Sequence, residues 1–159
     1  MENQFIEMYQ IGICVKNLDE KVENMKKIFG CEPSFRGETL KAGRKYFGKD
    51  GEFSAKIALF DFCNIQFEFI EPVDGDSIWR TYLDQQGEGL QHISYRVKNF
   101  EDAAAQMAEA GVEPSQQGWA MGRPARWDYF NTEPLLGFSV ECTSAMEHPE
   151  EHPRYPFDK

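Results

Sequence analysis

Four side chains of kinds that bind divalent metal ions lie where two halves of this sequence repeat each other. An amide and an imidazole open two similar segments, and each half adds one carboxylate on a later segment. The four residues are Gln10, Glu68, His92 and Glu141. Together they form a ligand set that suits Zn, Ni, Co, Fe or Mn and leaves open positions for substrate or water. We therefore expect one divalent metal ion at this site.

Taken singly, each of these residues also has an ordinary explanation. A lone histidine such as His92 is more often a hydrogen-bonded core or surface residue than a ligand, and a lone glutamate on a sheet is usually solvated. Gln10 alone carries almost no information. The set gains weight from its equivalent placement in the two halves, because unpaired buried carboxylates are costly unless a metal compensates them.

An internal repeat defines those equivalent positions. The segment Gln10–Leu18 aligns with His92–Phe100 at an offset of 82 residues. Residues identical in the two copies are Ile11 and Ile93, Val15 and Val97, Lys16 and Lys98, and Asn17 and Asn99. After a one-residue gap, Gly-Cys-Glu-Pro at 30–33 aligns with Gly-Val-Glu-Pro at 111–114. Two copies of one supersecondary unit explain such a run of matches in register.

Each copy predicts a strand followed by a helix. Apolar residues alternate with others in the segments that begin at Gln10 and His92, a pattern typical of half-buried strands. Capping signals then bound a helix in each copy. The expected N-caps are Asn17 and Asn99, with Glu20 and Asp102 at the capping-box position, and the expected left-handed C-cap residues are Gly30 and Gly111.

Further strands complete each half. We expect them at 54–59, 64–70, 127–131 and 138–142. Others are expected inside 36–51 and 114–126, but these stretches are rich in Gly, Pro and charged residues, so the strand bounds there are not defined. One face of these strands is apolar and the other is more polar, and Glu68 and Glu141 lie on the polar faces. The sequence therefore predicts an α+β fold of two βαβββ modules whose mixed β-sheet forms a cup, with polar faces inward and helices outside.

The chain divides into four segments on this interpretation. The first module spans 1–75, a linking helix and loop span 76–89, the second module spans 90–146, and an irregular C-terminal arm spans 147–159. The linking helix is expected at Asp76–Gln86.

Composition excludes several classes of partner. The formal net charge of −10 argues against a nucleic-acid backbone, which requires a basic face. No apolar run approaches the roughly 18 residues that span a bilayer, and the first residues do not form a signal peptide, so we expect no membrane partner and a cytoplasmic location. The cysteines Cys14, Cys31, Cys63 and Cys142 are widely spaced and are interpreted as reduced thiols.

The segments that carry these residues resemble the vicinal oxygen chelate (glyoxalase) superfamily. They are Gln10-Ile-Gly-Ile, Gly89-Leu-Gln-His-Ile-Ser-Tyr95, Gln66-Phe-Glu-Phe-Ile-Glu-Pro72 and Phe138-Ser-Val-Glu-Cys142. Within it, the stretch from Phe67-Glu-Phe-Ile-Glu-Pro72 to Gly87-Glu-Gly-Leu-Gln-His-Ile93 looks most like methylmalonyl-CoA epimerase. The superfamily resemblance covers nearly all of 8–143. It implies metal ligands at Gln10, Glu68, His92 and Glu141, and a homodimer.

The resemblance implies an enzyme that removes a proton next to a carbonyl group and stabilises the resulting enediolate. A carboxylate at the metal, Glu141 first and Glu68 second, would move the proton. The favoured small-molecule substrate is an acyl-CoA of the methylmalonyl-CoA kind. Arg96, Arg123 and Arg126 are candidates for holding an anionic group of that substrate, although solvated surface arginines explain them equally well.

Two other functions remain open. A Gln-Glu-His-Glu set is similar to that of the animal type of glyoxalase I, but the places where that enzyme has glutathione-binding arginines hold Cys14 and Glu88 here. The superfamily also contains metal-free proteins, resembling bleomycin-resistance proteins, whose cup only sequesters a ligand. For such a protein the aromatic residues Trp119, Trp127 and Tyr129 would stack on a flat ligand, although core packing is the commoner role of such residues.

Overall fold

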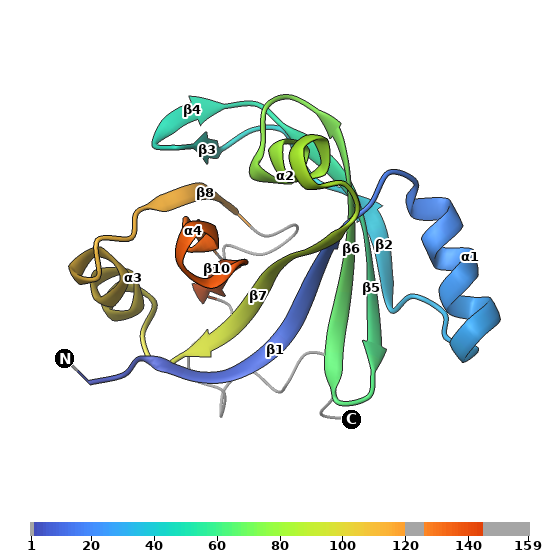
Figure 1. Cartoon of the computed structure of the whole chain (residues 1–159), viewed down its shortest axis with the longest axis horizontal. Helices are drawn as coiled ribbons and strands as arrows, with labels where there is room; N and C mark the ends of the chain where they lie inside the picture. Colours follow the sequence, from blue (N-terminus) through green and yellow to red (C-terminus); the bar gives the residue numbers. More distant parts are fainter. Residues whose placement is uncertain (1, 120–125, 145–159) are drawn as a thin grey trace.

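The computed structural model describes residues 2–119 and 126–144 and shows two βαβββ units joined in one curved sheet (Figure 1). The first unit contains β1 (Phe5–Cys14), α1 (Leu18–Phe29), β2 (Phe35–Glu38), β5 (Ser54–Phe62) and β6 (Ile65–Asp74). The second contains β7 (Gly89–Val97), α3 (Phe100–Glu109), β8 (Pro114–Trp119), β9 (Arg126–Phe130) and β10 (Ser139–Thr143). The predicted α+β cup of two such modules is confirmed.

The two units meet through their opening strands. The sheet order is β2-β5-β6-β1-β7-β10-β9-β8-β3-β4, with β1 antiparallel to β7 at the junction. At that junction Gln10 pairs with Ser94, and Gly12 pairs with His92. The repeat offset converts the first pair into the second, so the halves are related by a pseudo-twofold that passes near the Ile11–Ile93 pair.

The predicted N-caps and the predicted C-cap of α1 are confirmed, whereas the C-cap of α3 is Ala110 and the left-handed Gly111 follows it. The Asn17 side chain accepts a hydrogen bond from the Glu20 amide at 3.1 Å, and α1 ends at Gly30 with a positive φ of 68°. Asn99 caps α3 in the same way, through the Asp102 amide at 3.0 Å. These caps satisfy amides that the first helical turn leaves without an intrahelical partner.

Helices α1 and α3 cover the outer faces of the two units. Each closes a separate hydrophobic cluster, one around Leu18, Val22, Met25, Phe60 and Phe69, the other around Phe100, Ala103, Phe130, Val140 and Cys142. Burial of these clusters drives the sheet to curve around its other, more polar face. None of the helices within the described residues has the length and apolar character that crossing a bilayer requires.

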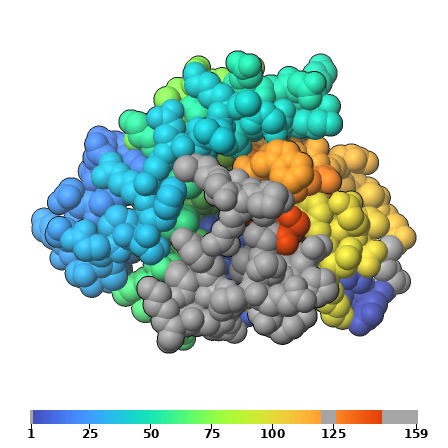
Figure 2. All heavy atoms as spheres, turned by 180° about the vertical axis from the view of Figure 1, so that it is seen from behind, coloured from blue at the N-terminus to red at the C-terminus, as the bar shows by residue number. Residues whose placement is uncertain are grey.

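An inserted hairpin ties the halves together a second time. β3 (Arg44–Tyr46) and β4 (Lys49–Gly51) lie in the stretch 36–51, where strands were expected without definite bounds. β3 pairs with β8 of the second half, and Figure 2 shows this hairpin in teal next to β8 in orange. This pairing could not be predicted from the sequence, because the docking of a hairpin on a distant edge strand leaves no local pattern.

Helix α2 (Ile78–Gln86) connects the units and packs over one end of the cup. Its Trp79 belongs to a third cluster, which includes Cys14, Ile70 and Tyr129. The linking helix was predicted at nearly these bounds. A short helix, α4 (Glu133–Leu136), occupies the segment that was expected only to connect two strands.

Candidate functional site

The four predicted ligands share the concave face of the central strands. Gln10 and His92 were expected to begin their strands, and this was wrong, because each lies inside a longer strand. Strand register arranges the face in two rows across the sheet. One row is Glu68–Gly12–His92–Ser139, and the other is Gln66–Gln10–Ser94–Glu141. Adjacent positions in such a grid bring side chains within reach of one another.

Gly12 makes room for the imidazole of His92. A Cβ atom at Gly12 would lie 1.7 Å from Cε1 of His92, far inside any tolerable contact. The ring therefore lies across the bare backbone of β1 and extends toward Glu68 on the next strand. A glycine in a strand often marks such a close approach, and this signal was present in the sequence but was not used there.

Gln91 fixes which nitrogen of His92 carries the proton. A register shift between Gly12 and Ile13 makes Gln91 the extra residue of a bulge, and its side chain is buried beside the histidine. Gln91 Nε2 donates to Glu133 Oε1 and to Ser139 Oγ, both at 3.1 Å.

The amide oxygen of Gln91 is consequently left to face His92 Nδ1, at 3.0 Å. An oxygen only accepts, so Nδ1 of His92 carries a proton, and the neutral imidazole has its lone pair on Nε2.

That lone pair faces two carboxyl groups inside the protein. His92 Nε2 lies 3.3 Å from Glu68 Oε2 and 3.5 Å from Glu141 Oε2. The histidine is fully buried, and its Nε2 has no hydrogen-bond partner in the described part of the chain. Three electron-rich atoms in a site of low polarity repel one another unless a cation or a proton lies between them.

The second row forms a directed chain of hydrogen bonds. Gln10 Nε2 donates to Gln66 Oε1 at 2.6 Å, and Gln66 Nε2 donates to Asp61 at 3.0 Å. The Ser94 hydroxyl lies 2.9 Å from Gln10 Oε1 and also contacts the Glu141 carboxyl group. One hydroxyl hydrogen cannot serve both acceptors. A protonated Glu141 that donates to Ser94, which then donates to Gln10, satisfies every group.

The electrostatics of Glu141 agree with this chain. Burial, reinforced by the negative charge of Glu68, raises the pKa of Glu141 to about 7, although the positive charge of a protonated His92 acts in the opposite direction. The Tyr129 hydroxyl is hydrogen-bonded to the same carboxyl group, and burial raises the pKa of Tyr129 well above its usual range. A carboxyl group with a pKa near neutrality is suited to accept and return a proton at physiological pH.

The donor types at this site fit a divalent metal, although the present side-chain positions do not enclose one. Within 2–119 and 126–144, no three His, Cys, Asp or Glu side chains are arranged to hold a metal ion. The hydrogen bonds just described turn Gln10 and Glu141 toward Ser94. The observation that favours a cation is His92 Nε2, which has no hydrogen-bond partner among the described residues and lies beside two carboxyl groups.

Two of the three predicted arginines, Arg96 and Arg126, do not join this cluster. Arg96 is buried on β7, and its Nε lies 3.5 Å from Glu7 Oε2 at the far end of the strand. Arg126 lies on the helix side of β9, where it forms two hydrogen bonds with Asp128 and stacks over Phe100 of α3. Arg123 lies outside the described residues. The substrate-binding roles of all three stay predictions.

A small cavity of about 70 Å³ reaches the partners of Gln91. It is bounded by Tyr46, Ile78 and Tyr82 on one side and by Glu133 and Ser139 on the other. The cavity lies at the end of the cup covered by α2. Movement of Glu133 or Ser139 there would displace the Gln91 amide and, through it, the imidazole of His92.

Comparisons with known proteins agree with this architecture. Residues 9–130 match the family model of the Glyoxalase/Bleomycin resistance protein/Dioxygenase superfamily. The fold is similar to methylmalonyl-CoA epimerase from Mycobacterium tuberculosis, with 18% identity, a TM-score of 0.65 and coverage of 90% of both chains. It is also similar to a variant of the Streptomyces coelicolor epimerase in complex with 2-nitronate-propionyl-CoA, with 21% identity, a TM-score of 0.68 and coverage of 91% of this chain and 99% of that one.

A hypothetical protein from Bacillus halodurans has a TM-score of 0.65 at 20% identity, with coverage of 86% of this chain and 92% of that one. No curated protein sequence is similar enough to this chain to count as a match. The family model spans most of the chain, and the two paired βαβββ units carry the polar cup that the sequence resemblance implied. On these grounds the chain belongs to the Glyoxalase/Bleomycin resistance protein/Dioxygenase superfamily.

Proposed function

We propose that this protein is a metal-dependent isomerase or epimerase that moves a proton next to the carbonyl group of an acyl-CoA-like substrate. One observation carries the proposal. The Nε2 atom of His92 is buried without a hydrogen-bond partner among the described residues and lies within 3.5 Å of two carboxyl groups. Such a set is stable when it shares a cation.

Gln10, Glu68, His92 and Glu141 would hold the metal. When bound, a divalent ion at this point would polarise a carbonyl oxygen and stabilise the negative charge of an enediolate. Binding requires Gln10 or Glu141 to leave its hydrogen bond with Ser94. The Gln91 amide would keep His92 in the tautomer that ligates through Nε2, which is the usual task of a group behind a metal-bound histidine.

Glu141 is the residue proposed to move the proton. Without a bound cation, burial raises its pKa to about 7, so this carboxyl group can take up a proton near neutral pH. Ser94 and Tyr129 hydrogen-bond the carboxyl group and hold it on the cup face. Glu68 is the second candidate, because it lies on the opposite side of His92 and belongs to the other half of the repeat. Two carboxyl groups on opposite sides suit a reaction that returns the proton to either face of a carbon.

The substrate class is supported by the structural neighbours. One of the similar structures is a methylmalonyl-CoA epimerase in complex with methylmalonyl-CoA, with 21% identity and a TM-score of 0.66. Identity at this level supports a shared fold and does not assign a substrate. Methylmalonyl-CoA is therefore the first compound to test. Glyoxalase chemistry on a glutathione adduct is second, because the Gln10 position matches that ligand set.

The first experiment measures metal content and metal affinity. Protein purified without chelators is compared with His92→Ala and Glu141→Ala, and Glu32→Ala is the control, because Glu32 is an exposed carboxylate paired with Lys26 outside the cup. We expect about one equivalent of metal in the wild type and control, and loss of affinity by at least about tenfold in both cup variants. Wild-type protein that takes up none of Zn, Ni, Co, Fe or Mn would refute the proposal and leave a ligand-binding protein.

Activity is then measured as solvent deuterium uptake at C2 of methylmalonyl-CoA. Metal-loaded wild type should catalyse the exchange, and Glu141→Gln should lower its rate by about 100-fold or more, as expected for loss of a general base. Metal binding without exchange, together with turnover of a hemithioacetal of glutathione, would favour the glyoxalase-type alternative.

A further inference from the structure

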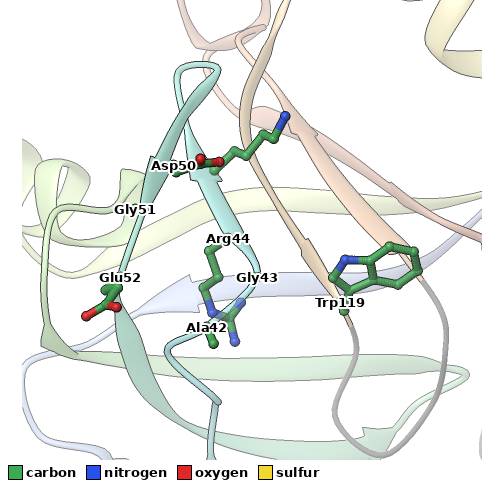
Figure 3. A pocket seen from close by; sticks show the side chains of 8 residues that line it. Ala42, Gly43, Arg44, Asp50, Gly51, Glu52 and Trp119 are labelled. Carbon is green, nitrogen blue, oxygen red and sulfur yellow. The ribbon is translucent and has the colours of Figure 1, made fainter.

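We propose that a cavity beside the β3–β4 hairpin binds the carboxylate of a small organic acid through Arg44. The cavity measures about 620 Å³ and lies between the hairpin and the end of β8, where Trp119 is located (Figure 3). No residue of the predicted metal set lines it. This inference therefore does not rest on the proposed catalytic function.

Arg44 is a buried cation without an acidic partner. Its side chain is only 3% exposed, and its Nε donates to the Leu40 carbonyl oxygen at 2.5 Å. Its Nη1 is shielded from solvent and has no hydrogen-bond partner among the described residues. No carboxylate of 2–119 or 126–144 forms an ion pair with it.

Aromatic rings supply only part of the missing compensation. The guanidinium carbon lies 5.2 Å from the ring centre of Phe53 and 5.1 Å from that of Trp127. These contacts stabilise a cation modestly, whereas removal of an unpaired charge from water is costly. Burial accordingly lowers the pKa of Arg44 below its usual range. The guanidinium thus lacks an anionic partner among the described residues, and a bound carboxylate would supply one.

The rim of the cavity narrows the class of that anion. Lys45, Asp50 and Glu52 are exposed around it, so one positive and two negative charges surround the buried guanidinium. In Figure 3 the Arg44 side chain runs toward Ala42, Asp50 lies farther along the hairpin, and Trp119 stands on the neighbouring strand. Rim carboxylates repel a phosphate dianion more than a single carboxylate, whose planar oxygens match the guanidinium fork.

Trp119 defines the rest of the ligand. Its side chain is 55% exposed at the cavity, which is unusual for tryptophan. Gly43 lies next to it with φ at +73°, and an added Cβ would lie 3.5 Å from Trp119 Cδ1. The absent side chain leaves the edge of the indole uncovered. A flat or apolar group attached to the carboxylate would therefore stack on Trp119.

The test uses benzoate as the probe and the full-length protein. Titration is followed by tryptophan fluorescence and by the NMR signal of the Trp119 indole N–H. We expect saturable binding in the wild type, a loss of affinity of at least about tenfold in Arg44→Met, and a smaller loss in Trp119→Ala. Arg36→Met is the matched control, because Arg36 is an exposed arginine paired with Asp19, and it should bind as the wild type does.

Three outcomes would overturn the proposal. Benzamide, the neutral analogue, could bind as tightly as benzoate. Phenyl phosphate could bind more tightly, which would exclude a carboxylate site. Arg44→Met could retain wild-type affinity.

Thermal unfolding separates this role from a structural one. We expect Arg44→Met to melt at the wild-type temperature or above, because it removes a buried unpaired charge and keeps the volume. A clear fall in melting temperature with unchanged benzoate affinity would assign Arg44 to the scaffold and refute the site. If Arg44→Met does not fold, Arg44→Lys retains the charge without the planar fork, and it should still weaken benzoate binding by several-fold.

Discussion

Two residues of the cup, Gly12 and Gln91, control the position and the tautomer of His92. Gly12 allows the imidazole of His92 to cross β1, and Gln91 decides which imidazole nitrogen remains free. Neither residue is a candidate ligand. Both control whether His92 presents a lone pair to Glu68 and Glu141, so their substitution should damage metal binding without removing a donor.

Gly12→Ala is the sharpest test of the imidazole position. The new methyl group would overlap the ring, so we expect His92 to rotate away and metal affinity to fall by at least about tenfold. Overpacking should also lower the free energy of unfolding by about 1–3 kcal/mol. Calorimetric metal titration and denaturant unfolding measure the two effects. Gly51→Ala is the control, since its added Cβ makes only ordinary contacts at 3.7 Å or more. Full metal affinity in Gly12→Ala would contradict the assigned ring position.

Gln91→Met tests the tautomer. Loss of the amide oxygen frees Nδ1 of His92 from its acceptor, so the ring loses its preference for a free Nε2. We expect metal affinity to fall by about 10- to 100-fold, as is typical when the group behind a ligating histidine is removed. Gln85→Met, at an exposed position of α2, should have no effect. A ¹⁵N NMR spectrum of the metal-free wild type should show Nδ1 protonated, and a protonated Nε2 would contradict the prediction.

At the scale of elements, the β3–β4 hairpin links the halves where the sheet would otherwise end. The Phe47 amide donates to the Ser115 carbonyl at 2.8 Å, and the Tyr46 hydroxyl hydrogen-bonds Thr81 of α2 at 3.0 Å. Tyr46 also packs against the cluster inside the cup. The hairpin therefore fixes α2 and β8 at once, and it positions Arg44 beside its cavity.

Tyr46→Ala should detach this hairpin. We expect it to lower the free energy of unfolding by about 2–4 kcal/mol, because the side chain is half-buried and carries a hydrogen bond. Hydrogen exchange of the Phe47 amide should accelerate more than exchange in β1 and β7. Tyr46→Phe, which keeps the ring, should cost about 1 kcal/mol. Equal acceleration throughout the sheet would show that the hairpin does not open by itself.

At the scale of the whole molecule, the central strand pair makes the two halves one folding unit. β1 and β7 pair along most of their length, and both form the floor of the cup. The protonation state of the buried Glu141 should therefore affect the free energy of unfolding of the whole chain.

The stability of metal-free protein should depend on pH through Glu141. Its folded pKa is about 7, above the usual 4.5, so its contribution is fully present below 4.5 and is lost as pH rises toward 7. The expected loss is on the order of 3 kcal/mol. Urea unfolding between pH 5 and about 8 measures it, in the presence of a chelator. Glu141→Gln should flatten this dependence and be the more stable protein at pH about 8. A wild-type stability that rises across this range would contradict the raised pKa.

Both the architecture and the candidate ligands could be predicted from the amino-acid sequence. The repeat, the alternating strands and the helix caps are local patterns, and local patterns survive in one dimension. They placed Asn17 and Asn99 at helix starts and put Glu68, His92 and Glu141 on one face, as the structure has them.

The contacts between these side chains follow from the tertiary structure and could not be predicted from the sequence. The bulge that turns Gln91 toward His92, the imidazole lying over Gly12 and the Ser94 hydrogen bonds depend on the register between strands distant in sequence. The position of Arg126 also depends on tertiary structure, because only the pairing of β9 with β10 shows that Arg126 and Asp128 lie on the helix side of the sheet. Register is set by the sum of packing across the whole sheet, so no single segment of the sequence contains it.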